Sequence, residues 1–357
     1  MLKHKLRFVA LAGVALTLLG ADDPVKVEFP GWFSNPVFSA DGKVLAYVRM
    51  EALASGARTA PTQIVLWDVG AGKEARRIAG PADDSLLGTV ALSPDGKRLA
   101  VGLWNTAVRL WDLDKGKEIG RVKNSQGAMG LRFAPDGRTV GWLKDDEICL
   151  AEAATARELA HFGKEKDTRI TGLAFADGGK TVLSGHLQSK DVSGPGAGKN
   201  KTLEHRITYW AREAAGGKKL HQIGETVTET RRVFDGLPAH ELFVSSDGKT
   251  VYLVGERGIQ VCDAATGKKT RDIAAPWKAA ANDPVRRLAL SANGKVAALA
   301  SAKGVVAVWD LTARKELRRI ETAQSIDHLA LSPDGKTLAI SHQTPGRVGA
   351  VLLICRL

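Results

Sequence analysis

A five-residue motif of the form Ser-Pro-Asp-Gly-Lys recurs along the chain and constrains its fold more than any other feature. Short apolar runs flank each of seven copies, whose turn Asp or Asn residues are Asp41, Asp95, Asp136, Asp177, Asp247, Asn293 and Asp334. Proline favours the first central position of a type I turn, Asp or Asn tolerates the second, and glycine supplies the positive φ that leads into the next strand. Each copy therefore predicts the corner of a β-hairpin, and seven similar corners predict seven copies of one building block.

The spacing of the corners predicts the size of that block. Asp95, Asp136 and Asp177 follow one another at intervals of 41 residues, and the other intervals are equal to this or longer. A basal period of about 40–45 residues is typical of a propeller blade. Within residues 89–122, four short runs rich in Val, Ile and Leu alternate with Gly/Asp/Lys turns, which predicts a four-stranded antiparallel meander.

The two ends of the repeat region predict how the ring closes. The seventh copy offers three strands, at 328–331, 337–341 and 350–355, before Leu357. Val25–Phe29 alternates polar and apolar residues and has no partner in the first copy. Pairing these two segments would protect a strand edge that would otherwise expose backbone donors and acceptors. The predicted fold is therefore all-β, a seven-bladed β-propeller of four-stranded antiparallel blades in which the N-terminal strand closes the last blade.

The third predicted strand of several blades ends in a Trp-Asp pair, at Trp67-Asp68, Trp111-Asp112 and Trp309-Asp310. Together with the preceding corner and the following Gly-Lys type of turn, this pattern resembles the WD-repeat family of β-propellers over residues 25–357. The resemblance implies a bulky apolar residue at this position that seals each blade against its neighbour. The predicted sealing residues are Trp67, Trp111, Trp210, Cys262, Trp309 and Cys355.

The sequence also departs from that family. Many members carry a Gly-His before the first strand and an Asp between the second and third strands, which hydrogen-bond through Ser or Thr to the Trp. This chain lacks the Gly-His at those places, so apolar packing is expected to hold the blades together. The three cysteines, Cys149, Cys262 and Cys355, are odd in number and have no CxxC spacing, which excludes a disulfide framework.

The first residues have the order of a secretory signal. Lys3, Lys5 and Arg7 precede an apolar run over 8–19, and small residues follow it. We expect a signal peptide at 1–21, cleaved after Ala21, and a propeller domain at 22–357, so that the protein is periplasmic, attached to the cell envelope or secreted. An uncleaved anchor or a buried first helix is the alternative. Nothing later in the chain is apolar for long enough to predict a membrane span.

The connections between strands predict where a partner binds. In an antiparallel meander the second-to-third and fourth-to-first connections share one face, and here they hold nearly all the length variation. The largest insertion, Leu187–His205, is rich in Gly, Ser and Lys and is expected to be mobile, and Gly224–His240 should lie beside it. The predicted partner-binding residues are Lys190, Lys199, Arg231, Arg232, Phe234 and Leu237. Alternatively, Phe234 and Leu237 fold back onto their own blade.

The chain carries no HExxH, GxSxG or Cys–His motif, so the sequence assigns no catalytic, cofactor-binding or metal-binding residue. The favoured hypothesis is a non-catalytic exported scaffold, monomeric, that binds an unidentified protein through its long-loop face. One alternative is a propeller hydrolase or lactonase acting at the central channel, near His240 and His328. Another is a binder of nucleic acid or an anionic envelope polymer, suggested by the net charge of +12. Nucleic acid is disfavoured because the basic residues are spread over every repeat.

Overall fold

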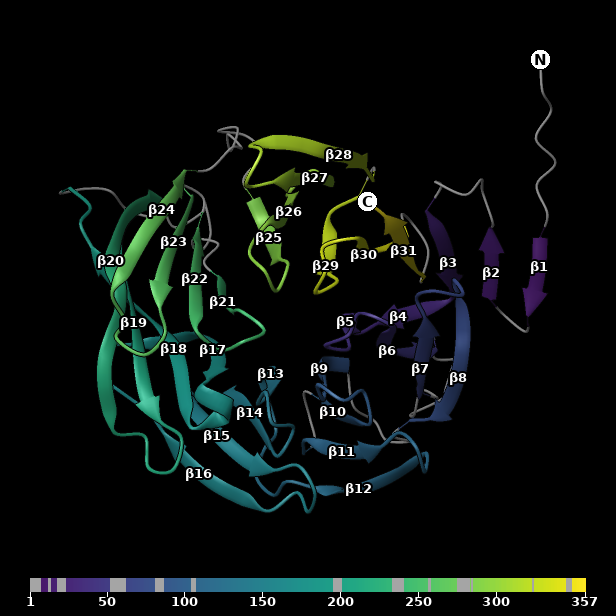
Figure 1. The fold of residues 1–357 in the computed structure, drawn as a ribbon, viewed down its shortest axis with the longest axis horizontal. Helices are drawn as coiled ribbons and strands as arrows, with labels where there is room; N and C mark the ends of the chain where they lie inside the picture. The colour runs from purple at the N-terminus through teal and green to yellow at the C-terminus, as the bar shows by residue number, and fades with distance from the viewer. Residues whose placement is uncertain are drawn as a thin grey trace.

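In the computed structural model, seven antiparallel sheets stand radially around one axis and form a seven-bladed propeller (Figure 1). The structure describes residues 8–11, 14–17, 24–51, 62–80, 87–103, 107–194, 201–232, 241–255, 258–274, 283, 285–322, 324–344 and 349–357. In this part of the chain a single 3-10 turn, Asp177–Gly179, is the only helix. The predicted fold class is confirmed.

The strands follow the chain blade by blade. Blade one contains β4 (Gly31–Phe33), β5 (Val37–Phe38), β6 (Val44–Glu51), β7 (Thr62–Asp68) and β8 (Lys73–Ala79). Blade two contains β9 (Leu87–Leu92), β10 (Arg98–Leu103), β11 (Arg109–Asp112) and β12 (Lys117–Arg121). Blade three contains β13 (Met129–Phe133), β14 (Thr139–Lys144), β15 (Glu147–Glu152) and β16 (Glu158–Phe162). Blade four contains β17 (Arg169–Ala176), β18 (Thr181–Asp191), β19 (Thr202–Glu213) and β20 (Lys219–Arg232).

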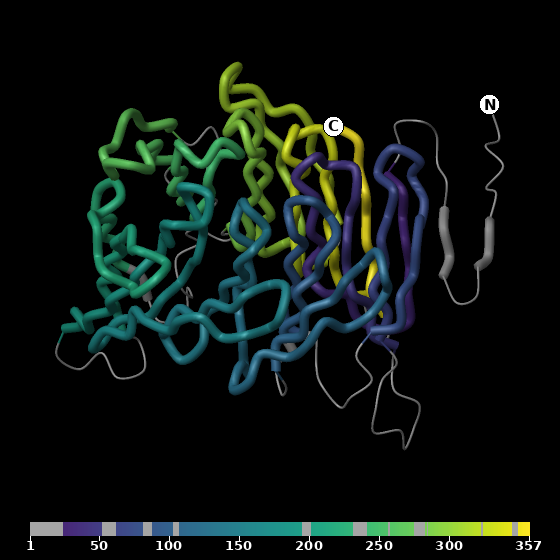
Figure 2. Tube along the Cα trace, turned by 60° about the horizontal axis from the view of Figure 1, so that its bottom comes forward, coloured from purple at the N-terminus to yellow at the C-terminus, as the bar shows by residue number. Residues whose placement is uncertain are grey.

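The remaining blades complete the ring. Blade five contains β21 (Glu241–Val244), β22 (Thr250–Gly255), β23 (Gly258–Asp263) and β24 (Lys269–Ala274). Blade six contains β25 (Val285–Leu290), β26 (Val296–Ser301), β27 (Val305–Asp310) and β28 (Lys315–Glu321). Blade seven contains β29 (Ile326–Leu331), β30 (Thr337–Gln343), β31 (Ala350–Arg356) and β3 (Val25–Phe29). Two further strands, β1 (Phe8–Leu11) and β2 (Val14–Thr17), continue this last sheet outward from β3 (Figure 1). Figure 2 shows the ring tilted, with the yellow C-terminal strands of blade seven beside purple N-terminal strands.

The predicted closure of the ring by Val25–Phe29 is confirmed. β3 pairs antiparallel with β31, from Val25 opposite Ile354 to Phe29 opposite Ala350. Val27 and Phe29 are buried in a cluster that also contains residues of blade one. The Phe29 ring lies 5.8 Å from that of Phe33, and the Arg49 guanidinium lies 4.8 Å above it. The N-terminal strand therefore completes blade seven and also contributes to its contact with blade one.

The seven repeated corners join first and second strands as predicted, and a serine side chain stabilises five of them. Ser39 Oγ donates to Asp41 Oδ1 at 2.6 Å and accepts from the Val44 amide at 3.0 Å. Ser93, Ser245, Ser291 and Ser332 make the same pair of bonds in their own blades. The hydrogen bond from Ser39 lowers the pKa of Asp41. Gly42 has a φ of 71°, which an L side chain rarely adopts.

Apolar clusters fill the seams between neighbouring blades. Trp67 is buried in the seam between blades seven and one, and Trp111 in the seam between blades one and two. Cys355 lies in the seam of blades six and seven, and half-buried Trp309 packs in that of blades five and six. The indole nitrogens of Trp67, Trp111 and Trp309 have no hydrogen-bond partner among the described residues. Apolar contact therefore holds these seams, in line with the expected absence of the family's polar network.

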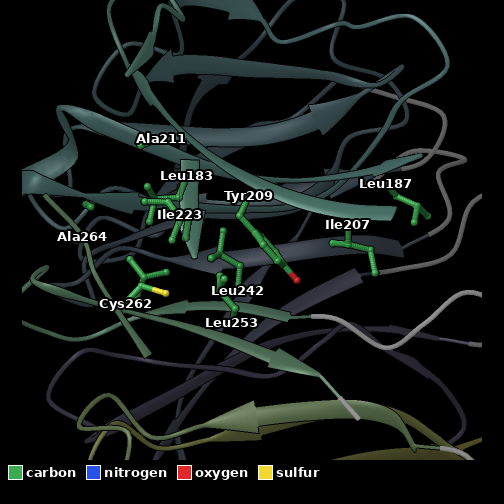
Figure 3. Packing of buried hydrophobic residues seen from close by; sticks show 13 residues of the cluster. Leu183, Leu187, Ile207, Tyr209, Ala211, Ile223, Leu242, Leu253, Cys262 and Ala264 are labelled. Atoms are coloured by element: carbon green, nitrogen blue, oxygen red, sulfur yellow. The ribbon is translucent and has the colours of Figure 1, made fainter. Parts of the chain in front are cut away.

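The three cysteines are free thiols, each buried in a seam. Cys262 lies beside Leu183 and Ile223 of blade four (Figure 3). Burial raises the pKa of Cys262 and of Cys355 to about 11. At neutral pH these groups are thus protonated and act as small apolar side chains.

The prediction for blade four is wrong in register. The sealing position is the residue of the third strand that faces the second residue of the second strand, as Trp67 faces Leu45. In blade four the residue that faces Val182 is Arg212, and Trp210 faces Ser184. Because strand side chains alternate with a period of two, Trp210 points to the same side two positions earlier. Trp210 is half-buried there, with the Lys219 ammonium 4.4 Å above its ring.

Candidate protein-interaction site

Blade four is longer than the other blades because its outer three strands continue past the ring. β18, β19 and β20 are 11, 12 and 14 residues long, whereas the equivalent strands of blade five are 6 residues each. We call the extension, residues 187–191, 202–207 and 224–232, the blade-four arm. It lies on the face of the ring that carries the second-to-third and fourth-to-first connections, which is the face predicted to bind a partner.

The arm replaces two segments predicted as loops. The Gly/Ser/Lys-rich insertion was expected to be mobile, but Leu187–Asp191 pairs with β19, as far as Asp191 opposite Leu203. The following insertion continues as β20, with Thr228 opposite Arg206 and Arg232 opposite Thr202. Its buried residues explain the extension, because Leu187 and Ile207 pack into the seam with blade five (Figure 3). The strands of blade four therefore extend beyond the ring because buried apolar side chains anchor the start of the extension.

Local hydrogen bonds order the arm near its tip. The Val192 amide donates to the Thr202 carbonyl at 3.0 Å, and the Ser193 amide donates to Asp191 Oδ1 at 3.0 Å. Lys201 Nζ lies 2.9 Å from Asp191 Oδ2. The Ser193 hydroxyl, its amide and Lys201 together lower the pKa of Asp191 to about 2. Val192 stands 42% exposed beside them, which gives the tip an apolar contact point.

The structure places part of the predicted partner-binding set on this arm. Lys190 is exposed on β18, opposite Glu204. Arg231 and Arg232 lie at the end of β20. Lys199, Phe234 and Leu237 lie outside the described residues. The roles of all six residues in binding stay predictions.

Gly224 is the point where β20 leaves the body of blade four for the arm. Its φ is 62°, and a Cβ atom at this position would lie 2.8 Å from Leu253 Cδ1. Its amide donates to the Gly267 carbonyl at 2.8 Å, and the next amide, of Glu225, donates to Gln260 Oε1 at 2.9 Å. Glycine is required here because the backbone both turns and touches blade five. The base of the arm is therefore fastened to its neighbour.

A slot opens beside that attachment, between the arm and blade five. It encloses about 520 Å³ and is lined by Tyr209, by Thr226–Glu229 of β20, and by Leu253, Gly255, Gly258–Gln260 and Asp272–Ala274. One wall is thus a run of four consecutive arm residues. The opposite wall is formed by the outer strands of blade five.

The central channel is a second cavity, of about 550 Å³, lined by first strands of six of the blades. Most of its lining is apolar, and the ionisable residues among the described part of that lining are Arg132, Glu241, Arg287 and His328. Burial, with a smaller effect of Arg287, lowers the pKa of His328 to about 4, so this imidazole is neutral at pH 7. Among the described residues, no three His, Cys, Asp or Glu side chains are placed to hold a metal ion. His240 lies outside those residues.

Blade four also carries a charged cluster in its seam with blade three. Arg212 is 6% exposed, and its Nη2 makes a close ion pair with Oε1 of Glu165, which follows β16. Lys219 Nζ lies 2.9 Å from the same oxygen. His186 Nδ1 lies 3.9 Å from it, and His186 Nε2 lies 2.9 Å from Ser184 Oγ. Ser184 and His186 are buried, so this group stabilises the seam rather than facing a substrate.

Acid is expected to weaken this seam through His186. Its burial, helped by the positive charges of Arg212 and Lys219, lowers its pKa from 6.5 to about 4. Because the folded pKa lies below the unfolded one, the stabilisation is complete above pH 6.5 and is lost as the pH falls toward 4. Urea unfolding should show a loss of about 2 kcal/mol from this residue between pH 7.5 and pH 5. His186→Gln should remove that loss, and an unchanged pH dependence in the variant would contradict it.

No helix in the described part of the chain has the length and apolar character needed to cross a membrane.

Comparison with known proteins agrees with the geometry. Residues 72–112 match the WD domain, G-beta repeat family (WD40), a span that ends with Trp111-Asp112. No curated protein matches the chain in sequence. Among solved structures, the chain is similar to the beta-propeller domain of Myceliophteria thermophila Cps50 (Swd1), with a TM-score of 0.63 and 16% sequence identity over 90% of this chain and 96% of that one. WD40 propellers typically serve as protein-interaction scaffolds and are generally non-catalytic. The chain is thus a seven-bladed β-propeller in which residues 72–112 match the WD40 repeat family.

Proposed function

We propose that this propeller is a non-catalytic protein-interaction scaffold that binds its partner through the face carrying the blade-four arm. The arm is the observation that carries the proposal, because it adds an ordered three-stranded surface to one side of a rigid ring. Loops and extensions on a rigid scaffold are the usual sites of binding. Exposed Lys190 and Val192 supply the mixture of charge and apolar area that such interfaces use.

We also propose that the protein is exported. The charged, apolar and small-residue order of residues 1–21 is that of a signal peptide. β1 and β2 lie outside β3, so removal of 1–21 would leave blade seven with four strands, like most other blades. The partner would then be a protein of the cell envelope or its surroundings.

Affinity capture from the native envelope fraction tests this function. In the arm variant, an Asn-Gly turn replaces residues 189–205, and a Gly/Ser segment of equal length replaces residues 228–232. This design keeps Leu187, Ile207 and Val227, which pack at the base of the arm. We expect the variant to fold and to lose partners that the parent retains. The intact mass of the propeller itself, purified from the same fraction, reports whether residues 1–21 are removed.

The matched control changes the opposite face. Lys97, Lys249 and Lys336 are exposed corner residues there, and their replacement by Glu should leave capture unchanged. If the arm variant captures every partner of the parent, or if the corner variant alone loses them, the binding face is wrongly assigned.

A further inference from the structure

The central channel changes character along its length. Four residues before the corner motifs, its described lining is mostly polar or charged, with Asn35, Thr89, Glu241, Arg287 and His328. At the two positions directly before the motifs it is apolar with one exception, and these residues are Val37, Phe38, Ala91, Leu92, Phe133, Phe243, Ala289, Leu290, Ala330 and Leu331. We call this second level the apolar zone. It lies next to the corner face, about 7–10 Å along the strands from the polar level.

The size and shape of the channel suit an elongated small molecule. It encloses about 550 Å³, and pockets that bind small molecules usually measure about 300–1,000 Å³. In blade seven the lining extends from His328 to Pro333, or about 17 Å at the usual rise of a strand. Phe38, Phe133 and Phe243 are half-buried, so their rings leave apolar surface for a ligand. All corner motifs belong to the described part of the chain, so described residues bound this end of the channel.

Arg132 is the exception within the apolar zone. Its side chain is exposed, and Nη1 donates to the Leu131 carbonyl at 2.9 Å. A guanidinium has several N–H donors, so most of them stay available for a ligand. In the described lining Glu241 supplies the only carboxylate, and it lies two blades away at the polar level. A carboxylate is the ligand group that an arginine in such surroundings binds best.

Arg287, the other cation of the channel, is less available than Arg132. Its Nε donates to the Asp327 carbonyl at 2.8 Å, and its Nη1 donates to the Arg286 carbonyl at 3.1 Å. Arg287 and Asp327 also line a neighbouring cavity of about 210 Å³. Burial raises the pKa of Asp327 and the charge of Arg287 opposes that rise, so the two groups interact. The charge of Arg287 is therefore partly offset, and Arg132 is the stronger anchor for an anion.

We propose that the central channel binds a linear aliphatic carboxylate, a ligand of the fatty-acid class. The carboxylate accepts hydrogen bonds from the Arg132 guanidinium, and the hydrocarbon chain lies against Phe38, Phe133 and Phe243 in the apolar zone. Burial of each methylene removes apolar surface of both ligand and channel from water. This site lies on the axis of the ring, apart from the blade-four arm, so it adds to the proposed scaffold function and does not depend on it.

Titration calorimetry of the full-length protein with decanoate, decanol and butanoate tests this inference. Decanoate should bind at one site per chain, at least about tenfold more tightly than decanol, which lacks the charge. It should also bind at least about tenfold more tightly than butanoate, which has the same charge but a shorter chain. Equal affinity for decanoate and decanol, binding of several decanoates per chain, or no binding of decanoate would overturn the proposal.

Variants of the channel then locate the site. Arg132→Gln should lower the affinity for decanoate about tenfold and leave that for decanol unchanged, which a purely structural role would not do. Ala330→Phe adds a ring to the apolar zone and should block both ligands. Arg157→Gln removes the same charge from an exposed position just before the outer strand of blade three and should change nothing. Parental decanoate binding by folded Arg132→Gln would refute the assignment even if Ala330→Phe does not fold.

The arm variant separates this proposal from the scaffold function. It should bind decanoate like the parent, because no residue of the blade-four arm lines the described part of the channel. Loss of decanoate binding in the arm variant would place the ligand in the slot beside the arm and contradict the channel site. If the arm variant captures every partner, the scaffold function fails, whatever the titrations show.

Discussion

Removal of residues 1–29 should lower the midpoint of thermal unfolding by roughly 10–20 °C, or prevent folding altogether. This truncation deletes β3, whose pairing with β31 involves five residues, from Val25 to Phe29. Each lost ladder hydrogen bond costs about 1 kcal/mol. Loss of the buried Val27 and Phe29 side chains adds about 2–5 kcal/mol each. The total is on the order of 10 kcal/mol, and differential scanning calorimetry measures its effect.

The matched control removes residues 1–21 and keeps β3. It should melt within a few degrees of the parent, because β1 and β2 lie outside the ring-closing strand. Two truncated proteins with the same melting temperature would contradict the role given to β3. The protein that lacks residues 1–29 also exposes the unpaired edge of β31, so we expect this truncated protein to aggregate more readily than the control.

The second large effect concerns the blade three–four seam, where Glu165→Gln should destabilise the protein by about 2–3 kcal/mol in urea unfolding. The change leaves buried Arg212 without its carboxylate partner. Breaking a fully buried ion pair costs about 3–5 kcal/mol. The loss predicted here is smaller because the Glu165 side chain is 32% exposed and solvent screens its charge. Glu213→Gln, at an exposed neighbour of Arg212, should stay within about 0.5 kcal/mol of the parent.

A double variant tests why the cluster is there. Glu165→Gln combined with Arg212→Trp places a tryptophan at the sealing position that Trp67, Trp111 and Trp309 occupy in their blades. Apolar packing should then replace the ion pair and restore most of the lost stability. A double variant less stable than Glu165→Gln alone would show that the seam is shaped for the charged cluster and cannot accept the apolar residue.

The fold could be predicted from the sequence because its signals are local and repeated. Each corner motif requires a positive φ at its glycine, and the structure has φ of 71° at Gly42 and 70° at Gly96. The closing strand could be predicted because an unpaired alternating segment at one end matched a missing strand at the other. Such signals depend on backbone geometry, which tertiary context rarely overrides.

The register of blade four was missed although a signal for it was present. Trp67, Trp111 and Cys262 each lie five residues before the glycine of a following Gly-Lys turn, at Gly72, Gly116 and Gly267. The same count from Gly217 leads to Arg212. Trp210 fits the sealing position equally well by periodicity, because it lies on the same face of the strand as Arg212.

The arm could not be predicted because composition and packing disagree there. Residues 187–205 are rich in Gly, Ser and Lys, which is typical of a linker. Three well-spaced apolar residues, Leu187, Ile207 and Val227, nevertheless anchor the sheet on blade five. Likewise, the slot depends on Tyr209 and Glu229 meeting blade five, and that contact leaves no pattern within one segment.

Site-specific photo-crosslinking measures the central claim, that the arm face binds the partner, most directly. A photoreactive amino acid at position 190, on the arm, should crosslink to a defined protein in the native envelope fraction. The same amino acid at position 97, on a corner of the opposite face, should not. Crosslinking of that protein from position 97 but not from position 190 would contradict the account.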